Sequence, residues 1–168
     1  RGTVTAENIV AATHFPLLNK RGAYFLKLYQ ARSYVLALEN APEVGGMYVD
    51  EGEKGLSFRD YKGFLLLGGG GHRTGKKGGG WRELEDFAKR RYPQAGIAAR
   101  WAAQDCMTLD GVPYVGRYSR GTKGLYVATG FNKWGMTSSM AAARLLADLV
   151  QGKENPWAEL FSPSRRVL

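Results

Sequence analysis

A segment near the C-terminal end of the chain has the residue types and spacing of a ligand-binding turn. The apolar stretch Leu125–Ala128 leads to two glycines, Gly130 and Gly135, which are followed by Thr137–Ser139 and the alanine- and leucine-rich run Met140–Val150. This order predicts a buried strand, a tight loop and a helix with one of the three hydroxyl residues as its N-cap. Such a helix start directs free N–H groups at one point, which suits a phosphate or an electron-rich ring edge. Glycines also occur in ordinary strand–helix turns, so a ligand-binding turn and a turn without any ligand both stay open as interpretations.

A second glycine-rich stretch resembles the phosphate-binding loop of nucleoside triphosphatases. It runs from Gly70 to Lys77 with the sequence GGHRTGKK. That loop needs Ser or Thr after its first lysine, because the hydroxyl binds Mg²⁺, and here Lys77 occupies the position. The glycines 78–80 also delay the next helix, so we do not expect a triphosphatase. No G-x-G-x-x-G pattern occurs in the chain, so it lacks a complete dinucleotide-binding unit.

Three further side chains are candidates for chemistry. His72 follows an apolar strand and could bind an anion or transfer a proton, or it could be a loop histidine bonded to the backbone. Arg73 could bind a carboxylate, or it could belong to the ordinary surface. Cys106 has no histidine near it in the sequence, and we expect it to be small, buried and inert.

Composition narrows the classes of function. The 168 residues contain one cysteine and two histidines, which excludes an internal disulfide and predicts no metal site. Together with the absence of a signal peptide and of an apolar run of about 20 residues, this predicts a cytoplasmic protein without a membrane span. The net charge of +9 lies in short separate clusters, which favours solvated surface over nucleic-acid binding. The chain starts at Arg1 rather than Met, so we expect a piece of a longer protein.

Periodicity predicts an α/β chain with an antiparallel middle. A helix is expected from Trp81 to the residue before Pro93, and strands at both ends of the chain could share one sheet, with the middle as an inserted lobe. The strands expected in the middle are Arg32–Leu38, Met47–Val49, Gly55–Arg59, Gly63–Gly68 and Ala98–Gln104.

Four segments, in order, resemble the C-terminal part of flavin-dependent oxidoreductases of the D-amino acid oxidase class, which includes glycine oxidase and sarcosine oxidase. The segments are Asn8–Thr13, Gly63–Gly75, Asp105–Gly116 and Leu125–Val150. The tail 155–165 is similar to members that carry a Rieske iron–sulfur domain further along the chain.

The resemblance implies a fold and a domain plan. It implies the C-terminal portion of a Rossmann-like FAD-binding domain, with an antiparallel β-rich substrate lobe inserted. Residues 1–17 would supply a strand of the FAD domain, 18–100 the substrate-binding lobe and 101–168 the remainder of the FAD domain. The family's N-terminal dinucleotide-binding segment is missing, so this chain alone is expected to bind FAD poorly and to be inactive.

The resemblance also implies a reaction and a site. The whole protein would oxidise a C–N bond of a small amine or amino acid by hydride transfer to FAD. The amides of Met136 and Thr137 would stabilise negative charge on the reduced ring, while His72 and Arg73 are candidates for the substrate side. Cys106 lies a few residues from where some relatives attach flavin, so covalent attachment is not expected. The residues implied around the flavin are Gly130, Phe131, Asn132, Trp134, Gly135, Met136 and Thr137.

Two other classes of function stay open on sequence alone. One is a non-enzymatic domain whose glycine loop binds an anionic partner without any flavin. The other is a basic domain that binds nucleic acid through its Lys and Arg clusters, which would show as strongly salt-dependent binding.

Overall fold

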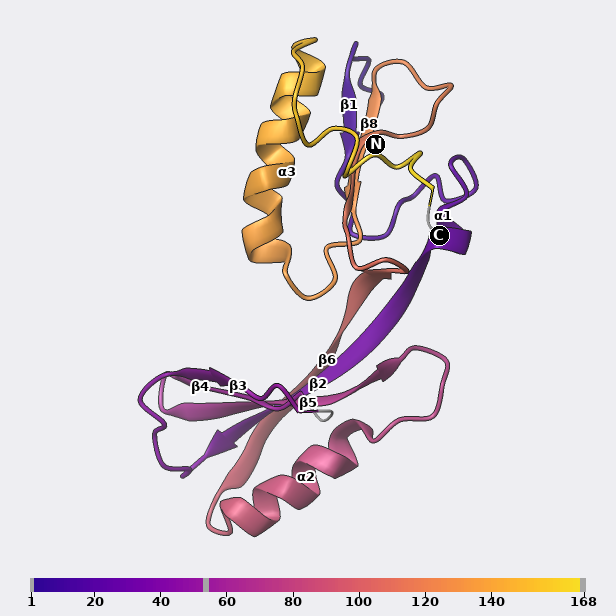
Figure 1. Cartoon of the computed structure of the whole chain (residues 1–168). Coiled ribbons are helices and arrows are strands. Elements are labelled where there is room, and N and C mark those ends of the chain that lie inside the picture. Colours follow the sequence, from indigo (N-terminus) through magenta and orange to yellow (C-terminus); the bar gives the residue numbers. More distant parts are fainter. Residues whose placement is uncertain (1, 53–54, 167–168) are drawn as a thin grey trace. The chain divides into compact units, whose positions relative to one another are not determined.

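The computed structural model describes residues 2–52 and 55–166, and the chain forms two compact units (Figure 1). The first unit combines both ends of the chain, Arg1–Tyr29 and Asp105–Leu168, and the second is Gln30–Gln104. Helices and strands are mixed, and antiparallel pairing dominates the second unit, which confirms the predicted fold class.

The first unit is built on a three-stranded sheet with the order β1-β8-β7. β1 (Ile9–Ala11) pairs in parallel with β8 (Leu125–Thr129), and β7 (Tyr114–Arg117) pairs antiparallel on the other side of β8. The predicted sharing of one sheet by both chain ends is therefore confirmed. The helix α3 (Gly135–Val150) runs alongside these strands, and a short helix, α1 (Tyr24–Lys27), precedes β2 (Figure 1).

Alternation along β8 divides the core of the first unit into two layers. Tyr126 and Ala128 point to one face, where they pack with Leu145 of α3, while Val127 points to the other face, where it packs with Tyr24. This follows from the two-residue period of a strand, which sends successive side chains to opposite faces. The sheet therefore needs cover on both sides, and α3 supplies it on one.

The second unit is a five-stranded sheet with the order β3-β4-β5-β2-β6. The turn between β4 and β5 consists of Lys62 and Gly63, both with positive φ, as a tight two-residue hairpin requires. The strands are β2 (Leu28–Glu39), β3 (Met47–Val49), β4 (Ser57–Tyr61), β5 (Phe64–Arg73) and β6 (Gly96–Thr108), and the helix is α2 (Gly80–Arg91).

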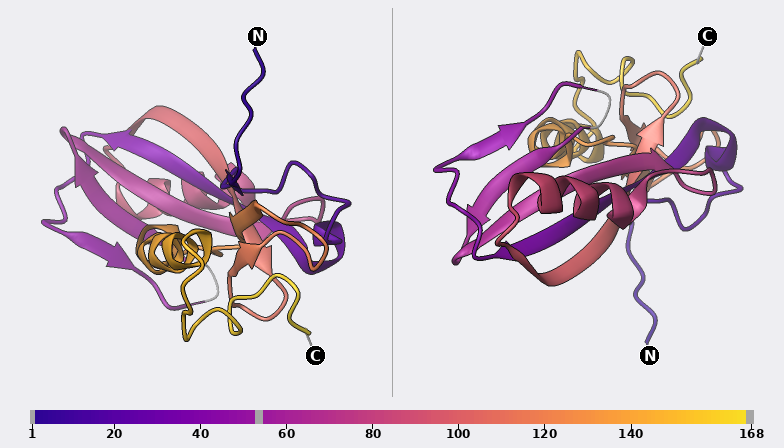
Figure 2. Two further views of the ribbon diagram at one scale, coloured as in Figure 1. Left: turned by 90° about the horizontal axis from the view of Figure 1, so that it is seen from above. Right: turned by 90° about the horizontal axis from the view of Figure 1, so that it is seen from below.

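The helix α2 lies across one face of this sheet (Figure 2). Leu84 and Ala88 of the helix are buried against alternate residues of β2 and β5, among them Leu36 and Leu67. Four leucines of these two strands, Leu36, Leu38, Leu65 and Leu67, are fully buried, and each contributes about 1.5–3 kcal/mol relative to leaving it exposed. The intervening residues of the same strands point to the opposite face, where a groove described below is found.

Among the helices in the described part of the chain, none is long and apolar enough to cross a lipid bilayer.

Candidate functional site

The turn that joins β8 to α3 begins at a glycine that fits where other residues would not. Gly130 has a φ of 70°, and a Cβ built there would overlap Cγ2 of Thr108 and approach Cδ2 of Leu28 to 3.2 Å. Glycine tolerates the positive φ and carries no side chain, so it meets both demands. The chain can therefore turn sharply at the end of β8 while lying close against Thr108.

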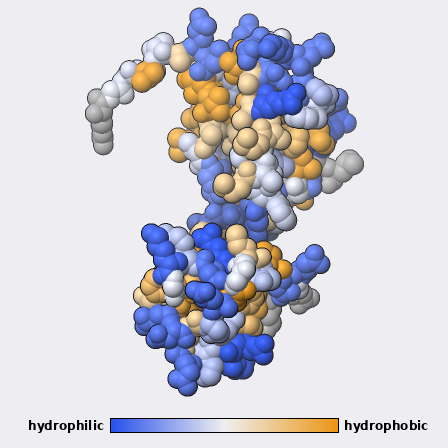
Figure 3. Space-filling model, turned by 90° about the vertical axis from the view of Figure 1, so that its left-hand side faces the viewer, coloured by the Kyte–Doolittle hydropathy of each residue, from blue (hydrophilic) through white to orange (hydrophobic). Residues whose placement is uncertain are grey.

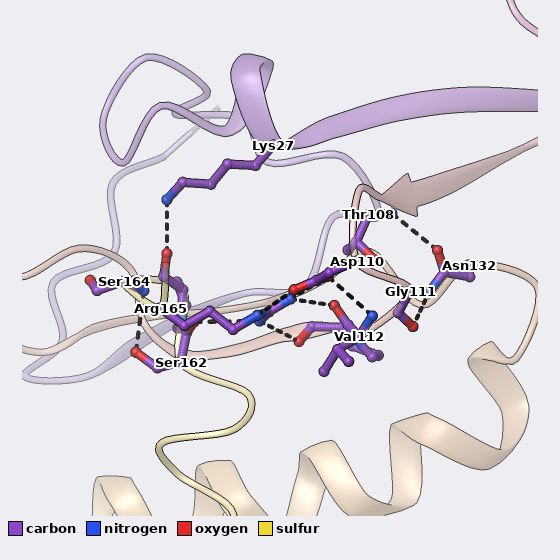
Figure 4. Close-up of polar contacts among 11 residues, drawn as sticks. Lys27, Thr108, Asp110, Gly111, Val112, Asn132, Ser162, Ser164 and Arg165 are labelled. Atoms are coloured by element: carbon purple, nitrogen blue, oxygen red, sulfur yellow. Dashed lines mark hydrogen bonds and ion pairs between the residues drawn. The ribbon is translucent and has the colours of Figure 1, made fainter. Parts of the chain in front are cut away.

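Asn132 braces this turn with hydrogen bonds in two directions. Its backbone N–H donates to the carbonyl of Cys106 at 3.0 Å, and its Oδ1 accepts from the N–H of Thr108 at 3.0 Å. Its Nδ2 donates to the carbonyl of Gly111 at 2.9 Å (Figure 4). The side-chain amide of Asn132 thus bonds to other backbone groups of the protein, and it connects the turn to the loop after β6.

The helix α3 begins at Gly135, so the prediction of a hydroxyl N-cap at Thr137–Ser139 is wrong. The N-cap is Trp134, which makes no side-chain capping bond, and its N–H donates instead to the carbonyl of Phe131 at 2.9 Å. This tight turn closes early and starts the helix before the hydroxyl residues. Thr137 Oγ1 donates to the carbonyl of Trp134 at 3.4 Å, within the first turn.

The first turn of α3 therefore offers backbone donors rather than a capped end. The N–H groups of Gly135, Met136 and Thr137 have no acceptor four residues earlier within the helix, and the first helical bond runs from Ser138 to Trp134 at 2.9 Å. These donors carry the positive end of the helix dipole. The arrangement suits a ligand with negative charge or electron-rich atoms.

Large apolar side chains are exposed around these donors. Trp134 is 72% exposed, Met136 92% and Met140 74%, whereas Phe131 is partly buried against the α3 core. Figure 3 looks onto the α3 side of this unit, where hydrophobic surface reaches the solvent. Free donors beside uncovered aromatic and thioether groups fit a flat, electron-rich ring.

Two buried polar groups lie behind the turn. The hydroxyl of Thr108 is buried and has no hydrogen-bond partner among the residues that the structure describes, which leaves it available to a bound group or a water molecule. Cys106 is 1% exposed, with its Sγ 3.6 Å from Oγ1 of Thr129, and burial raises the pKa of its thiol. The prediction of a buried cysteine is confirmed.

Arg165, in the C-terminal tail, binds the loop after β6. Sequence reasoning did not single it out. Arg165 forms a bidentate ion pair with Asp110, both N···O distances being 2.8 Å (Figure 4). Its guanidinium carbon also lies 3.8 Å from the centre of the Tyr114 ring. Nearby, Lys27 donates to the carbonyl of Pro163 at 2.8 Å. Arg165 lies far from this loop in sequence, and no local pattern marks such a contact.

In the second unit, His72 is held by its neighbours at the end of β5. Its Nε2 lies 2.9 Å from the hydroxyl of Tyr34, and its Nδ1 lies 3.0 Å from the carbonyl of Arg73. Its ring also stacks on Tyr34, with centroids 5.8 Å apart. The contact with the carbonyl of Arg73 fits the interpretation of His72 as a histidine bonded to the backbone, although His72 lies within β5 and not in a loop. The side chain of Arg73 is exposed.

The face of the second sheet opposite α2 carries a groove that sequence reasoning missed. Its volume is about 310 Å³, within the range of small-ligand pockets. Its polar groups are Ser57 and Arg59, and a Cβ on Gly68 would overlap Ser57 Oγ, so the glycine keeps the floor open. The alternation of the strands was its only sequence signal. The lining residues are Val35, Met47, Tyr48, Val49, Ser57, Phe58, Arg59, Leu66, Gly68 and Trp101.

Comparison with known proteins agrees with this geometry. Residues 1–149 match the family model of the FAD dependent oxidoreductases. The chain is 37% identical over 98% of its length to YhfW of Bacillus subtilis strain 168, whose name describes a Rieske 2Fe-2S iron–sulfur protein, and 29% identical over 92% of its length to a D-amino acid dehydrogenase of Allorhizobium ampelinum. Glycine oxidase of Geobacillus kaustophilus superposes with a TM-score of 0.78 at 26% identity, over 99% of this chain.

The chain spans only part of these relatives, namely 34% of YhfW, 38% of the dehydrogenase and 48% of the glycine oxidase. The family match nevertheless extends over most of the chain, and it includes both the turn at Gly130 and most of α3. The resemblance inferred from four short segments is therefore confirmed. The chain belongs to the family of FAD dependent oxidoreductases.

Proposed function

We propose that the whole protein is an FAD-dependent enzyme that oxidises the C–N bond of a small amine or amino acid. The observation that carries this proposal is the start of α3, where free N–H groups and exposed Trp134 occur together in a member of this family. The names of two relatives, glycine oxidase and D-amino acid dehydrogenase, support amino acids as the substrate class. FAD, when bound, supplies the group that accepts hydride from the substrate carbon.

In this proposal the residues after β8 bind the ring and stabilise its charge. The N–H groups of Met136 and Thr137 act as preorganised dipoles for negative charge that develops on the ring. Trp134 and Phe131 cover the ring with aromatic surface, and Gly135 leaves room for its close approach, since a Cβ there meets nothing nearer than Phe131 Cβ at 3.8 Å. Gly130 and Asn132 fix the turn that presents these groups.

We further propose that the groove of the second unit accepts the substrate side chain. Val35, Leu66 and Trp101 give it apolar walls, while exposed Arg59 gives it a cation that would pair with a carboxylate. The second unit would then be the substrate lobe and the first a share of the FAD domain. His72 stacks on Tyr34, which belongs to the core under α2, so we propose no contact between His72 and a substrate in this groove. Arg73 stays a candidate for the substrate side.

The remainder of the protein has a defined role in this proposal. The relatives are two to three times as long as the aligned chain, and the family's dinucleotide-binding segment is not found in these 168 residues. We propose that the remainder binds the pyrophosphate of FAD, so that the isolated chain binds FAD weakly and has no activity. Stoichiometric, tight FAD uptake by the isolated chain in a calorimetric titration would contradict this part.

The proposal is tested in the full-length protein with Gly135→Asp. Because Asp is favourable in the first turn of a helix, the fold should survive. The new carboxylate would repel negative charge on the ring, so we expect the Kd for FAD to rise at least about ten-fold, which is about 1.4 kcal/mol. The measurements are the flavin absorption bands of the purified protein and FAD titration of its apoprotein.

Gly135→Asn is the matched control, because it has nearly the same shape without the charge. It should bind FAD much as the wild type does. A wild-type protein purified without any flavin absorption, and unable to take up FAD, would refute the proposed function. Equal affinities of the wild type and the Asp variant would remove this helix start from the site.

A further inference from the structure

The guanidinium group of Arg165 is almost fully engaged by one loop, residues 108–113. Its Nε and one Nη donate to the two carboxylate oxygens of Asp110, each at 2.8 Å. The remaining donors reach the carbonyls of Val112 at 2.6 Å, Pro113 at 3.0 Å and Ser162 at 3.4 Å. Four of the five bonds thus end on that loop, and the side chain of Arg165 is only 12% exposed.

The contacts of Arg165 are more than the C-terminal tail needs for its attachment to the first unit. The tail is already anchored by Phe161, which packs into the α3 core and accepts a hydrogen bond from the N–H of Val115 at 2.8 Å. Two residues further along the tail, the carbonyl of Pro163 accepts a hydrogen bond from Lys27. The bonds of Arg165 instead determine the geometry of residues 110–113, which are otherwise a turn at the surface.

The turn between β8 and α3 holds the same loop from its other side. Asn132 accepts from the N–H of Thr108 and donates to the carbonyl of Gly111, directly beside the Asp110 that Arg165 binds (Figure 4). No bond between Arg165 and Asn132 is present, yet both act on one short loop. Asp110 and Asn132 are thus joined through one short loop, and Asn132 connects that loop to the turn that starts at Gly130.

We propose that Arg165 is a positioning residue for the flavin, acting through Asp110 and Asn132 on the turn that precedes α3. This inference rests on the proposed function. The planar guanidinium suits the role because its fork fixes direction as well as charge, which the ammonium of a lysine does not. The pair thereby couples residues of the C-terminal tail to the electronic environment of the cofactor.

The test uses the full-length holoprotein with Arg165→Ala, Arg165→Lys and, as the matched control, Arg117→Ala at an exposed arginine of β7. Arg165→Ala should raise the Kd for FAD about three- to ten-fold and shift both the flavin absorption maximum and its midpoint potential. Arg165→Lys should restore part of each change, and Arg117→Ala should change none of them. A merely structural role would lower the melting temperature while leaving the spectrum and potential of the bound flavin unchanged.

A double-mutant cycle with Asn132→Ala separates coupling from independent damage. If both residues act through one loop, the double variant should weaken the binding free energy of FAD by less than the sum of the two single variants. Hydrogen exchange at the N–H of Thr108 should also accelerate in Arg165→Ala. Additive effects, or flavin properties in Arg165→Ala equal to those in Arg117→Ala, overturn this proposal alone. A wild type without flavin overturns the proposed function and this inference with it.

Discussion

The two glycine-rich segments of this chain look alike in sequence and differ in what their glycines do. In the stretch 68–80, several glycines let the chain pack against itself, and at Gly78 a Cβ would overlap the ring of His72. In the stretch 130–135, Gly130 makes a sharp turn possible, while a Cβ on Gly135, at a helix start without a side-chain cap, would meet only Phe131 Cβ at 3.8 Å. Glycine density by itself therefore does not identify a ligand site, and the backbone donors at the start of α3 are what support the site proposed there.

Gly130→Ala tests the role of the glycine at the turn between β8 and α3. The substitution forces a positive φ on alanine and places its Cβ against Thr108, so we expect a loss of about 2–4 kcal/mol in unfolding free energy, from backbone strain plus overpacking. In the full-length protein, FAD binding should fall with it, because the turn carries the proposed site. Denaturant unfolding and FAD titration measure the two effects, and unaltered values in both would show that the turn tolerates a side chain.

Gly78→Ala tests the other glycine segment. The new methyl group would displace the ring of His72 from Tyr34, whose hydroxyl lies 2.9 Å from Nε2, so we expect a loss of about 1–3 kcal/mol in unfolding free energy. FAD affinity in the full-length protein should stay at the wild-type value, since these glycines serve packing. A variant that folds normally but loses FAD would assign a cofactor role to the segment 68–80.

The sequence predicted local features well and long-range ones poorly. The strand expected at Met47–Val49 is β3, and the helix expected from Trp81 to the residue before Pro93 is α2 (Gly80–Arg91). The start of α3 was missed because Trp134, a residue without a capping hydroxyl, holds the N-cap through its backbone bond to Phe131. Such a cap depends on a backbone hydrogen bond within the turn, and no residue type predicts that bond.

Polar contacts between segments that are distant in the chain could not be predicted from the sequence either. Arg165 is 55 residues from Asp110, and charged residues of both signs are frequent enough that no pairing could be chosen. The environment of His72 was open for the same reason, since its hydroxyl partner, Tyr34, belongs to a strand 38 residues earlier. Residue types and their spacing predicted the turn at Gly130, but the contacts that hold the turn in place came only from the three-dimensional arrangement.

The last prediction concerns the pH dependence of stability. It bears on the same two segments because the glycine segment 130–135 is braced, through Asn132, by a loop that carries an ion pair. The hydrogen bonds from Arg165 hold the pKa of Asp110 below its ordinary value of 3.8. A carboxyl with a lowered pKa stabilises the folded state above its unfolded pKa, and that stabilisation is lost as the pH falls through the folded pKa. The first unit should therefore lose stability below about pH 4, when Asp110 takes up a proton.

Asp110→Asn isolates this contribution, because the variant keeps the shape of the side chain but cannot ionise. Its unfolding free energy should be lower than that of the wild type at pH 7, and the gap should narrow as the pH falls below 4, since the wild type then loses the same ion pair. Urea unfolding at several pH values, with hydrogen exchange at the N–H of Thr108 as the local probe, measures the gap. A gap that stays constant with pH would mean that the charge on Asp110 contributes nothing, and that the bonds of Arg165 to the carbonyls of Val112 and Pro113 hold the loop unaided.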